Sequence, residues 1–228
     1  MGGPPSPLFA GPSTRSEVDV QAFLDHARSF PQRVTQQGGN LGKLAHGQRP
    51  MALFITCADS RVVPTMFTGA RPGELFELRV AGNIVPRYRP QAACGVAATL
   101  EYAVTALHVP DIIVCSHSHC AAVQGLMHPR QLSFLPLLEK WLSLSGHGTR
   151  AAGEPPTART ARVTHSDRPD PDTVAQLHTL LQLGNIRSYP FAATRIAAGK
   201  LRLHGWFYAV ETGQVYVEHP GSCRFQPL

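Results

Sequence analysis

Two short clusters in the sequence carry side chains that bind metals and move protons. The first cluster, in the run Cys-Ala-Asp-Ser-Arg, contains Cys57, Asp59 and Arg61, and the second contains His117 and Cys120. Two thiolates and one imidazole form a soft ligand set that suits zinc. Because three protein ligands leave the fourth tetrahedral position open, the set is typical of a catalytic rather than a structural zinc site.

Each of these residues also has an ordinary structural interpretation. A cysteine at a strand end often packs as a small apolar side chain, and an aspartate near an arginine often forms a surface ion pair of little energetic value. His119 competes with His117 as the possible imidazole ligand. Cys94 and Cys115 are interpreted as packing residues and Cys223 as incidental. The presence of both clusters in one chain favours the metal site.

The elements that must position these clusters are short apolar runs. Runs at 51–56 and 111–116 directly precede the two clusters, and another run covers 74–80. Continuous apolar runs of this length indicate strands that are buried on both faces. In open α/β sheets, ligands bind beyond the carboxyl ends of the strands, so the two clusters are expected to meet there.

Helical patterns alternate with these strands. The predicted helices are 91–107, a segment that begins at 121, 134–144, 172–184 and 190–198. Two alternating runs, 201–210 and 214–218, are separated by Glu-Thr-Gly and predict a C-terminal strand pair. This order of elements predicts an α/β fold with a mostly parallel central sheet flanked by helices.

The chain of 228 residues is long enough for one domain with a sizeable core. Residues 1–15 are rich in Gly, Pro and Ser and predict a mobile tail, and residues 16–228 are expected to form a single catalytic domain. The apolar spacing within 17–29 predicts an amphipathic N-terminal helical arm. Residues 145–171 have almost no large apolar side chains and predict a surface loop.

Composition and charge exclude several functional classes. Lys and Arg number 21 against 15 Asp and Glu, but the basic residues are scattered rather than gathered in a stripe, so no nucleic-acid partner is expected. No apolar run approaches the ~18 residues of a membrane span. The first residues lack the basic and apolar regions of a secretory signal, so we expect a cytoplasmic protein with reduced cysteines.

The two clusters and the sequence around them resemble those of the beta-class carbonic anhydrases, in particular of the bacterial branch. The resemblance covers about residues 18–219 and is carried by CADSR, PGELFELRVAGNIVP, ATLEYAV, IIVCSHSHC and LRLHGWFYAVETGQV. It implies that Cys57, His117 and Cys120 bind one zinc ion per chain. It also implies that Asp59 and Arg61 form a catalytic pair.

The resemblance further implies a reaction and an assembly. The reaction is the reversible hydration of carbon dioxide to bicarbonate and a proton, for which zinc activates a water molecule. Asp59 would accept a hydrogen bond from that water, and Arg61 would hold Asp59 ionised and oriented. Family members assemble as dimers or higher multiples through the N-terminal arm, so a homodimer or higher even oligomer is expected. Whether the zinc site is open or closed at neutral pH stays open.

Three positions depart from the pattern of this family. Ser116 and Ala121 stand where the family usually has glycine, and Val80 stands where it usually has asparagine. These departures remove no ligand, but they bear on turnover and on the shape of the pocket. They leave open a zinc-stabilised binding or regulatory module with weakened catalysis. Hydrolysis of carbon disulfide or carbonyl sulfide at the same site is a second alternative.

Overall fold

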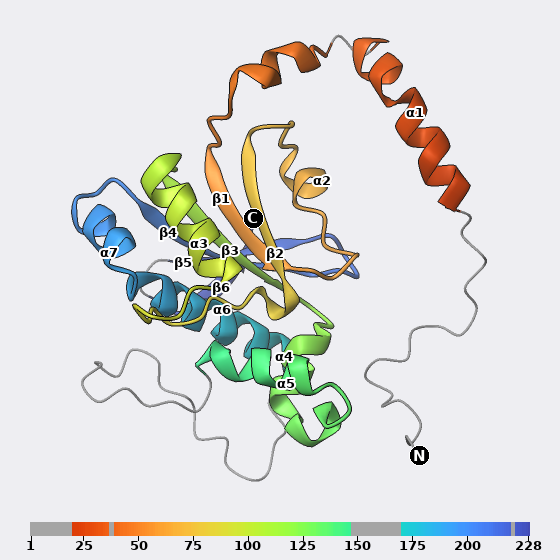
Figure 1. Ribbon diagram of the computed structural model, residues 1–228. Helices are drawn as coiled ribbons and strands as arrows, with labels where there is room; N and C mark the ends of the chain where they lie inside the picture. Colours follow the sequence, from red (N-terminus) through yellow and green to blue (C-terminus); the bar gives the residue numbers. More distant parts are fainter. Residues whose placement is uncertain (1–19, 37–38, 147–169, 220–221) are drawn as a thin grey trace. The chain divides into compact units, whose positions relative to one another are not determined.

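The computed structural model describes most of the chain (Figure 1). The described residues are 20–36, 39–146, 170–219 and 222–228. The tail predicted at 1–15 lies outside them, as does the loop predicted at 145–171 apart from its first two and last two residues. Among the described residues, no helix has both the length and the apolar character that crossing a membrane requires.

The chain divides into two compact units, of which the first is Met1–Gln48. It contains the helix α1 (Val20–Gln36) and the short 3-10 helix η2 (Leu41–His46). The helix predicted over 17–29 therefore continues further along the chain than its sequence pattern indicates, with Pro31 inside it. No residue of α1 is buried, although the helix is amphipathic.

The second unit, Arg49–Leu228, is built on a central sheet. Its strands are β1 (Ala52–Cys57), β2 (Leu75–Val80), β3 (Asp111–His117), β4 (Arg202–Tyr208), β5 (Val215–His219) and β6 (Arg224–Pro227). Within the described residues they form one six-stranded sheet in the order β2-β1-β3-β4-β5-β6. The first four in this order are parallel, and β5 and β6 are added antiparallel at one edge. The mostly parallel sheet and the C-terminal strand pair are confirmed, and β6 is an addition that the sequence pattern did not predict.

Helices pack on both faces and at one end of this sheet. They are α2 (Pro64–Thr68), η3 (Ala81–Asn83), α3 (Gly95–Glu101), η4 (Tyr102–Ala106), α4 (Ala121–Met127), η5 (Pro129–Leu132), α5 (Pro136–Leu142), η6 (Ser143–Ser145), α6 (Pro171–Arg187) and α7 (Pro190–Ala197). The helix predicted over 91–107 begins only at Gly95, because a turn follows Pro90 and Cys94 has an extended backbone.

The two faces of β1 explain its continuous apolar sequence. On one face, Leu53 and Ile55 belong to the main core, which α3, α6 and α7 complete with residues such as Leu100 and Ile186. On the other face, the Phe54 ring lies 5.7 Å from Trp206 of β4, and it also contacts Phe67 of α2 at 6.0 Å. Because successive side chains of a strand point to opposite faces, a strand covered on both sides needs no polar residue.

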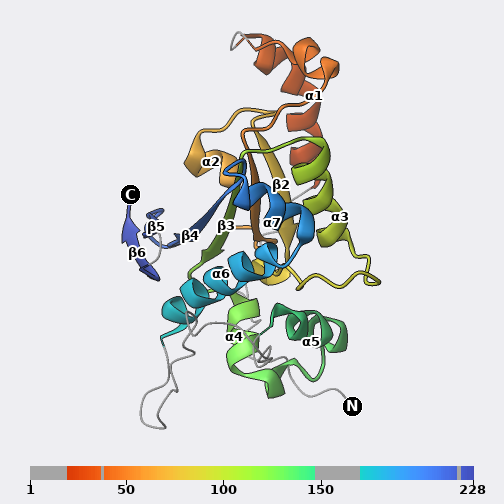
Figure 2. The same cartoon turned by 90° about the vertical axis from the view of Figure 1, so that its left-hand side faces the viewer.

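The carboxyl ends of β1 and β3 face a group of helices. Figures 1 and 2 show α4, α5 and α6 gathered at this end of the sheet, below the ends of the parallel strands. The turn η3, which follows β2, contacts β1, β3 and α4. Any site built at the strand ends is therefore enclosed by η3 and these helices.

Candidate metal centre

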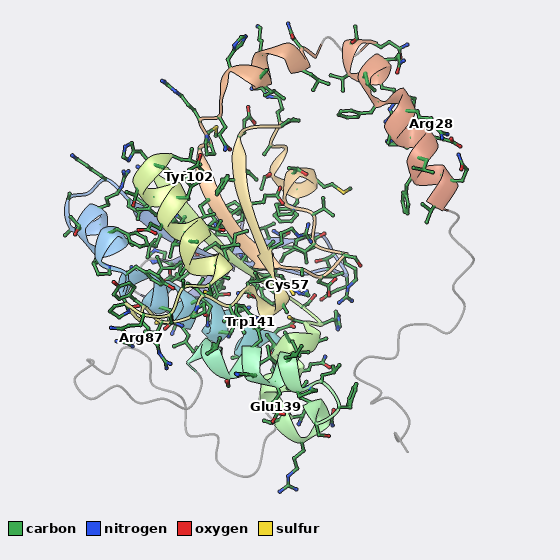
Figure 3. All side chains as sticks on the ribbon, in the orientation of Figure 1. Arg28, Cys57, Arg87, Tyr102, Glu139 and Trp141 are labelled. Carbon is green, nitrogen blue, oxygen red and sulfur yellow. The ribbon has the colours of Figure 1, made fainter. Side chains whose placement is uncertain are left out.

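The structure brings together the three residues that the sequence predicts as metal ligands. Cys57 ends β1, His117 ends β3, and Cys120 directly precedes α4. One ligand atom from each residue lies within 4.8 Å of the others, and all three residues are buried. Because β1 and β3 are adjacent parallel strands, their ends place the two sequence clusters side by side. Figure 3 labels Cys57 at this end of the sheet.

The His117 ring is oriented to bind a metal through Nε2. Its Nδ1 lies 2.8 Å from the carbonyl oxygen of Ser118, which can only accept, so Nδ1 carries the proton and Nε2 has a free lone pair. Nε2 is buried and has no hydrogen-bond partner among the described residues. A buried polar atom without a partner is costly, and a bound cation would satisfy it. Together with two sulfur atoms, this nitrogen fits tetrahedral zinc.

The two cysteines of the cluster interact directly through their sulfur atoms. A hydrogen bond from the Cys120 thiol lowers the pKa of Cys57 to about 4, and the N–H of Gly82 donates to Cys57 Sγ at 3.3 Å. The same hydrogen bond, together with burial, raises the pKa of Cys120. The contact therefore favours the thiolate form of Cys57, which is the form that binds a metal ion.

Asp59 lies beside the cluster and is held by Arg61. Arg61 Nε donates to Oδ1 at 2.9 Å and Nη2 donates to Oδ2 at 2.7 Å. These bonds lower the pKa of Asp59 to about 2. Asp59 Oδ2 is also 3.9 Å from His117 Nε2, so the carboxylate is next to the atom that faces the metal position. The pair thus lies next to the cluster and is not an isolated surface ion pair.

Arg79 of β2 is a residue of this region that the sequence did not single out. Its Nη2 donates to the carbonyl oxygens of Asp59 at 2.8 Å and Val62 at 2.6 Å. These bonds hold the backbone of the loop that carries the Asp59 side chain. The contact depends on the register of β2 against β1, in which Arg79 is paired with Thr56, and so no local sequence signal indicates it.

The loop between His117 and Cys120 is anchored to the turn after β4. Ser118 Oγ donates to Glu211 Oε2 at 2.6 Å and accepts from the N–H of Val210 at 2.9 Å. His119, the alternative imidazole ligand, is 61% exposed and lies 3.4 Å from Glu211 instead of joining the cluster. The anchored loop presents the Ser118 carbonyl that orients the His117 ring.

The departures from the family pattern have defined places in the structure. Ser116 is fully buried, and its hydroxyl accepts a hydrogen bond from Thr179 of α6 at 2.7 Å. Val80 is the strand partner of Cys57, and Ala121 is the first residue of α4. The additional hydroxyl of Ser116 is therefore satisfied by a helix that packs on the sheet.

The remaining cysteines lie outside the cluster. Cys115 is fully buried inside β3, where burial raises the pKa of its thiol, and Cys94 packs against the core at the start of α3. Cys223 is exposed just before β6. These positions agree with the interpretation of Cys94 and Cys115 as packing residues.

Comparisons with known proteins relate the whole fold to one family. The family model described as carbonic anhydrase matches residues 52–215. A carbonic anhydrase of Pseudomonas aeruginosa is 42% identical over 185 residues, which cover 81% of this chain and 80% of that protein. The structure of the beta-carbonic anhydrase CcaA matches with a TM-score of 0.80 and 36% identity, over 92% of this chain and 99% of the other.

A structure of a tetrameric beta-carbonic anhydrase from the filamentous ascomycete Sordaria macrospora also matches. Its TM-score is 0.68 at 26% identity, and the match covers 89% of this chain and 97% of that chain. The family model covers more than half of the chain, and the relative and both structures cover most of it. The chain therefore belongs to the carbonic anhydrase family, and within it to the beta class.

Proposed function

We propose that Cys57, His117 and Cys120 are the zinc ligands of this carbonic anhydrase and that Asp59 and Arg61 are its catalytic pair. The enzyme hydrates carbon dioxide reversibly to bicarbonate and a proton, and it depends on one zinc ion per chain. Zinc held by these three side chains lowers the pKa of a water molecule and supplies a nucleophile near neutral pH.

Asp59 acts in this proposal as an oriented hydrogen-bond acceptor. With a pKa of about 2, the carboxylate is ionised at neutral pH and can only accept. Arg61 restrains both carboxylate oxygens, and Oδ2 lies 3.9 Å from His117 Nε2. An acceptor fixed at this place engages a proton of the attacking water and turns an oxygen lone pair toward the carbon of the substrate.

The observation that carries the proposal is the approach of the three ligand atoms to within 4.8 Å beside an ionised Asp59. Its test is stopped-flow hydration of carbon dioxide by purified protein of measured zinc content, across neutral and mildly alkaline pH. We expect activity in proportion to the zinc content. Full zinc occupancy without turnover would instead support a binding or regulatory module, and activity on carbon disulfide alone would support the alternative hydrolase.

The proposal includes a homodimer or higher even oligomer, and α1 supports it. Its apolar side chains Val20, Phe23, Leu24 and Phe30 are between 44% and 65% exposed. We propose that a second copy of the chain covers these side chains, because a contiguous apolar stripe of this kind marks an interaction surface. Light scattering during size-exclusion chromatography should give an even multiple of the chain mass, and a monomer at micromolar concentration would contradict the proposal.

The proposed compartment is the cytoplasm. None of the five cysteines forms a disulfide, which supports a reducing environment. Fractionation of cells that express the protein should place it with cytosolic markers. Recovery with periplasmic or membrane markers would contradict this assignment.

A further inference from the structure

We infer that Trp141 of α5 is a positioning residue for Cys57, acting through the peptide group that joins Ala81 to Gly82. The inference rests on the proposed role of Cys57 as a zinc ligand. It concerns a side chain that comes from a helix later in the sequence and that does not belong to the ligand set.

The two ends of this single peptide group have different partners. Its carbonyl oxygen, on Ala81, accepts a hydrogen bond from Trp141 Nε1 at 2.8 Å. Its N–H, on Gly82, donates to Cys57 Sγ at 3.3 Å. Because a donor at the carbonyl oxygen polarises the amide, the Trp141 bond strengthens the N–H as a donor to sulfur. Figure 3 labels Trp141 and Cys57 in this region, where α5 approaches the end of β1.

The backbone at Gly82 is held in one conformation. Its φ of 68° lies in the left-handed region, and an added Cβ would lie 2.9 Å from the Cβ of Ala122 in α4. The next carbonyl oxygen, on Gly82 itself, lies 2.8 Å from His178 Nε2 of α6. The turn is thus fixed by Trp141 on one side and His178 on the other.

His178 belongs to a buried polar face of α6 that holds the same segment. Gln182 Oε1 accepts from the N–H of Val85 at 2.9 Å, and Asn185 Nδ2 donates to the Val85 carbonyl at 2.9 Å. His178, Gln182 and Asn185 are at most 3% exposed. Their contacts stabilise the backbone that follows Gly82, whereas Trp141 binds the peptide group that reaches Cys57.

The consequence for the metal follows from the charge on sulfur. A hydrogen bond to a thiolate ligand withdraws electron density from it and fixes its direction, which changes the affinity and the electronic properties of the bound ion. Two thiolates would otherwise neutralise the formal charge of a dication completely. We call the two hydrogen bonds from Trp141 to Ala81 and from Gly82 to Cys57 the Trp141 relay. With this relay, more positive charge stays on the bound ion than with two thiolates that accept no hydrogen bond.

The experiment measures whether the hydrogen bond from Gly82 to Cys57 Sγ reaches the bound metal and whether it depends on Trp141. In ¹⁵N-labelled protein loaded with ¹¹³Cd, we expect scalar coupling between the Gly82 amide proton and the cadmium nucleus through Cys57 Sγ. Replacing Trp141 with its benzothiophene analogue keeps the shape of the ring and removes the N–H. This analogue and Trp141→Phe should weaken the coupling, lower zinc affinity about tenfold in chelator competition, and move the thiolate-to-cobalt charge-transfer band to lower energy.

A control on the same helix separates positioning from stability. Leu142 follows Trp141 in the sequence and is only 2% exposed. Leu142→Ala should therefore lower the melting temperature without changing the charge-transfer band of the cobalt-loaded protein. If the benzothiophene protein keeps wild-type coupling, affinity and band, the inference is wrong, whether or not Trp141→Phe folds. If the Cys57 protons couple to cadmium but the Gly82 amide proton does not, the inference about Trp141 is wrong while the ligand role of Cys57 is kept. If Cys57 shows no coupling at all, the proposed ligand role fails.

Discussion

Arg61 binds Asp59 through two parallel hydrogen bonds, from Nε to Oδ1 at 2.9 Å and from Nη2 to Oδ2 at 2.7 Å. Arg61 Nη2 also donates to the carbonyl oxygen of His119 at 3.1 Å. One guanidinium therefore orients the carboxylate and links the loop after β1 to the loop after β3. These two loops and the strand ends that precede them carry all the residues proposed for the reaction.

Removing the charge of Asp59 should lower turnover and leave the metal in place. Asn offers a donor where the attacking water needs an acceptor, so Asp59→Asn is expected to reduce kcat by about 10²-fold or more at unchanged zinc content. Stopped-flow kinetics and elemental analysis measure the two quantities. The matched control is Asp111→Asn, because Asp111 forms a similar two-pronged pair with Arg202 at the opposite end of β3. Equal kcat values for the Asp59 variant and this control would remove Asp59 from the mechanism.

Replacing Arg61 with lysine should impair orientation more than ionisation. Lysine keeps the positive charge but cannot form the two parallel bonds. Without them the pKa of Asp59 would return toward its usual value of about 3.9, which still leaves the carboxylate ionised at neutral pH. Arg61→Lys is therefore expected to lower kcat roughly tenfold without a new acidic limb above about pH 5 in the pH–rate profile. A new limb near neutral pH would show that Arg61 controls the charge of Asp59.

Removal of the metal should lower both activity and stability. Without the metal, His117 Nε2 stays buried with no hydrogen-bond partner among the described residues, next to two buried cysteines. A ligand present at a hundredfold excess over its Kd stabilises the native state by about 2.7 kcal/mol, which corresponds to a melting temperature roughly 5 °C higher or more. Scanning calorimetry with chelator, and with chelator plus excess zinc, makes the comparison. Identical melting temperatures would contradict a structural contribution of the metal.

Gly82 should tolerate a side chain less well than a glycine of the same backbone conformation. Gly82 and Gly69 both have a φ of 68°, but an added Cβ at Gly69 meets nothing within 4 Å, whereas at Gly82 it meets Ala122 Cβ at 2.9 Å. We expect Gly69→Ala to cost about 1 kcal/mol of unfolding free energy and Gly82→Ala about 2–4 kcal/mol. Denaturant unfolding measures both, and equal losses would show that α4 moves away without cost.

The Asp111 pair should contribute stability only above the acid range. Hydrogen bonds from Arg202 and then His204 lower the pKa of Asp111 in the folded protein. A lowered pKa gives stability that is present above the unfolded value of about 3.9 and is lost as the pH falls through the folded value. Because the Arg202 side chain is 66% exposed and solvent screens the pair, Asp111→Asn should cost less than about 1 kcal/mol at pH 7. This cost should shrink toward zero as the pH falls below about 4, as urea unfolding of both proteins would show. If the stability cost of Asp111→Asn instead grew as the pH fell, the pKa of Asp111 would be raised rather than lowered by folding.

Local sequence features determined the ligand types and the elements that carry them. A continuous apolar run is sufficient to indicate a buried strand, and Cys57 and His117 stand at the ends of two such runs. Adjacent parallel strands place their carboxyl ends at one edge, so the meeting of the two clusters followed from the fold class. The pattern did not indicate β6, because a four-residue edge strand has too few residues to show an alternation.

Only the tertiary structure decided what surrounds these ligands. Trp141 reaches Ala81, Thr179 reaches Ser116, and Arg79 supports the loop after β1. These contacts depend on which helix packs at which end of the sheet and on the register between strands, and neither is encoded in a local spacing of residue types. The sequence by itself therefore predicted which side chains are proposed as metal ligands, whereas packing between distant segments determined how those side chains are held.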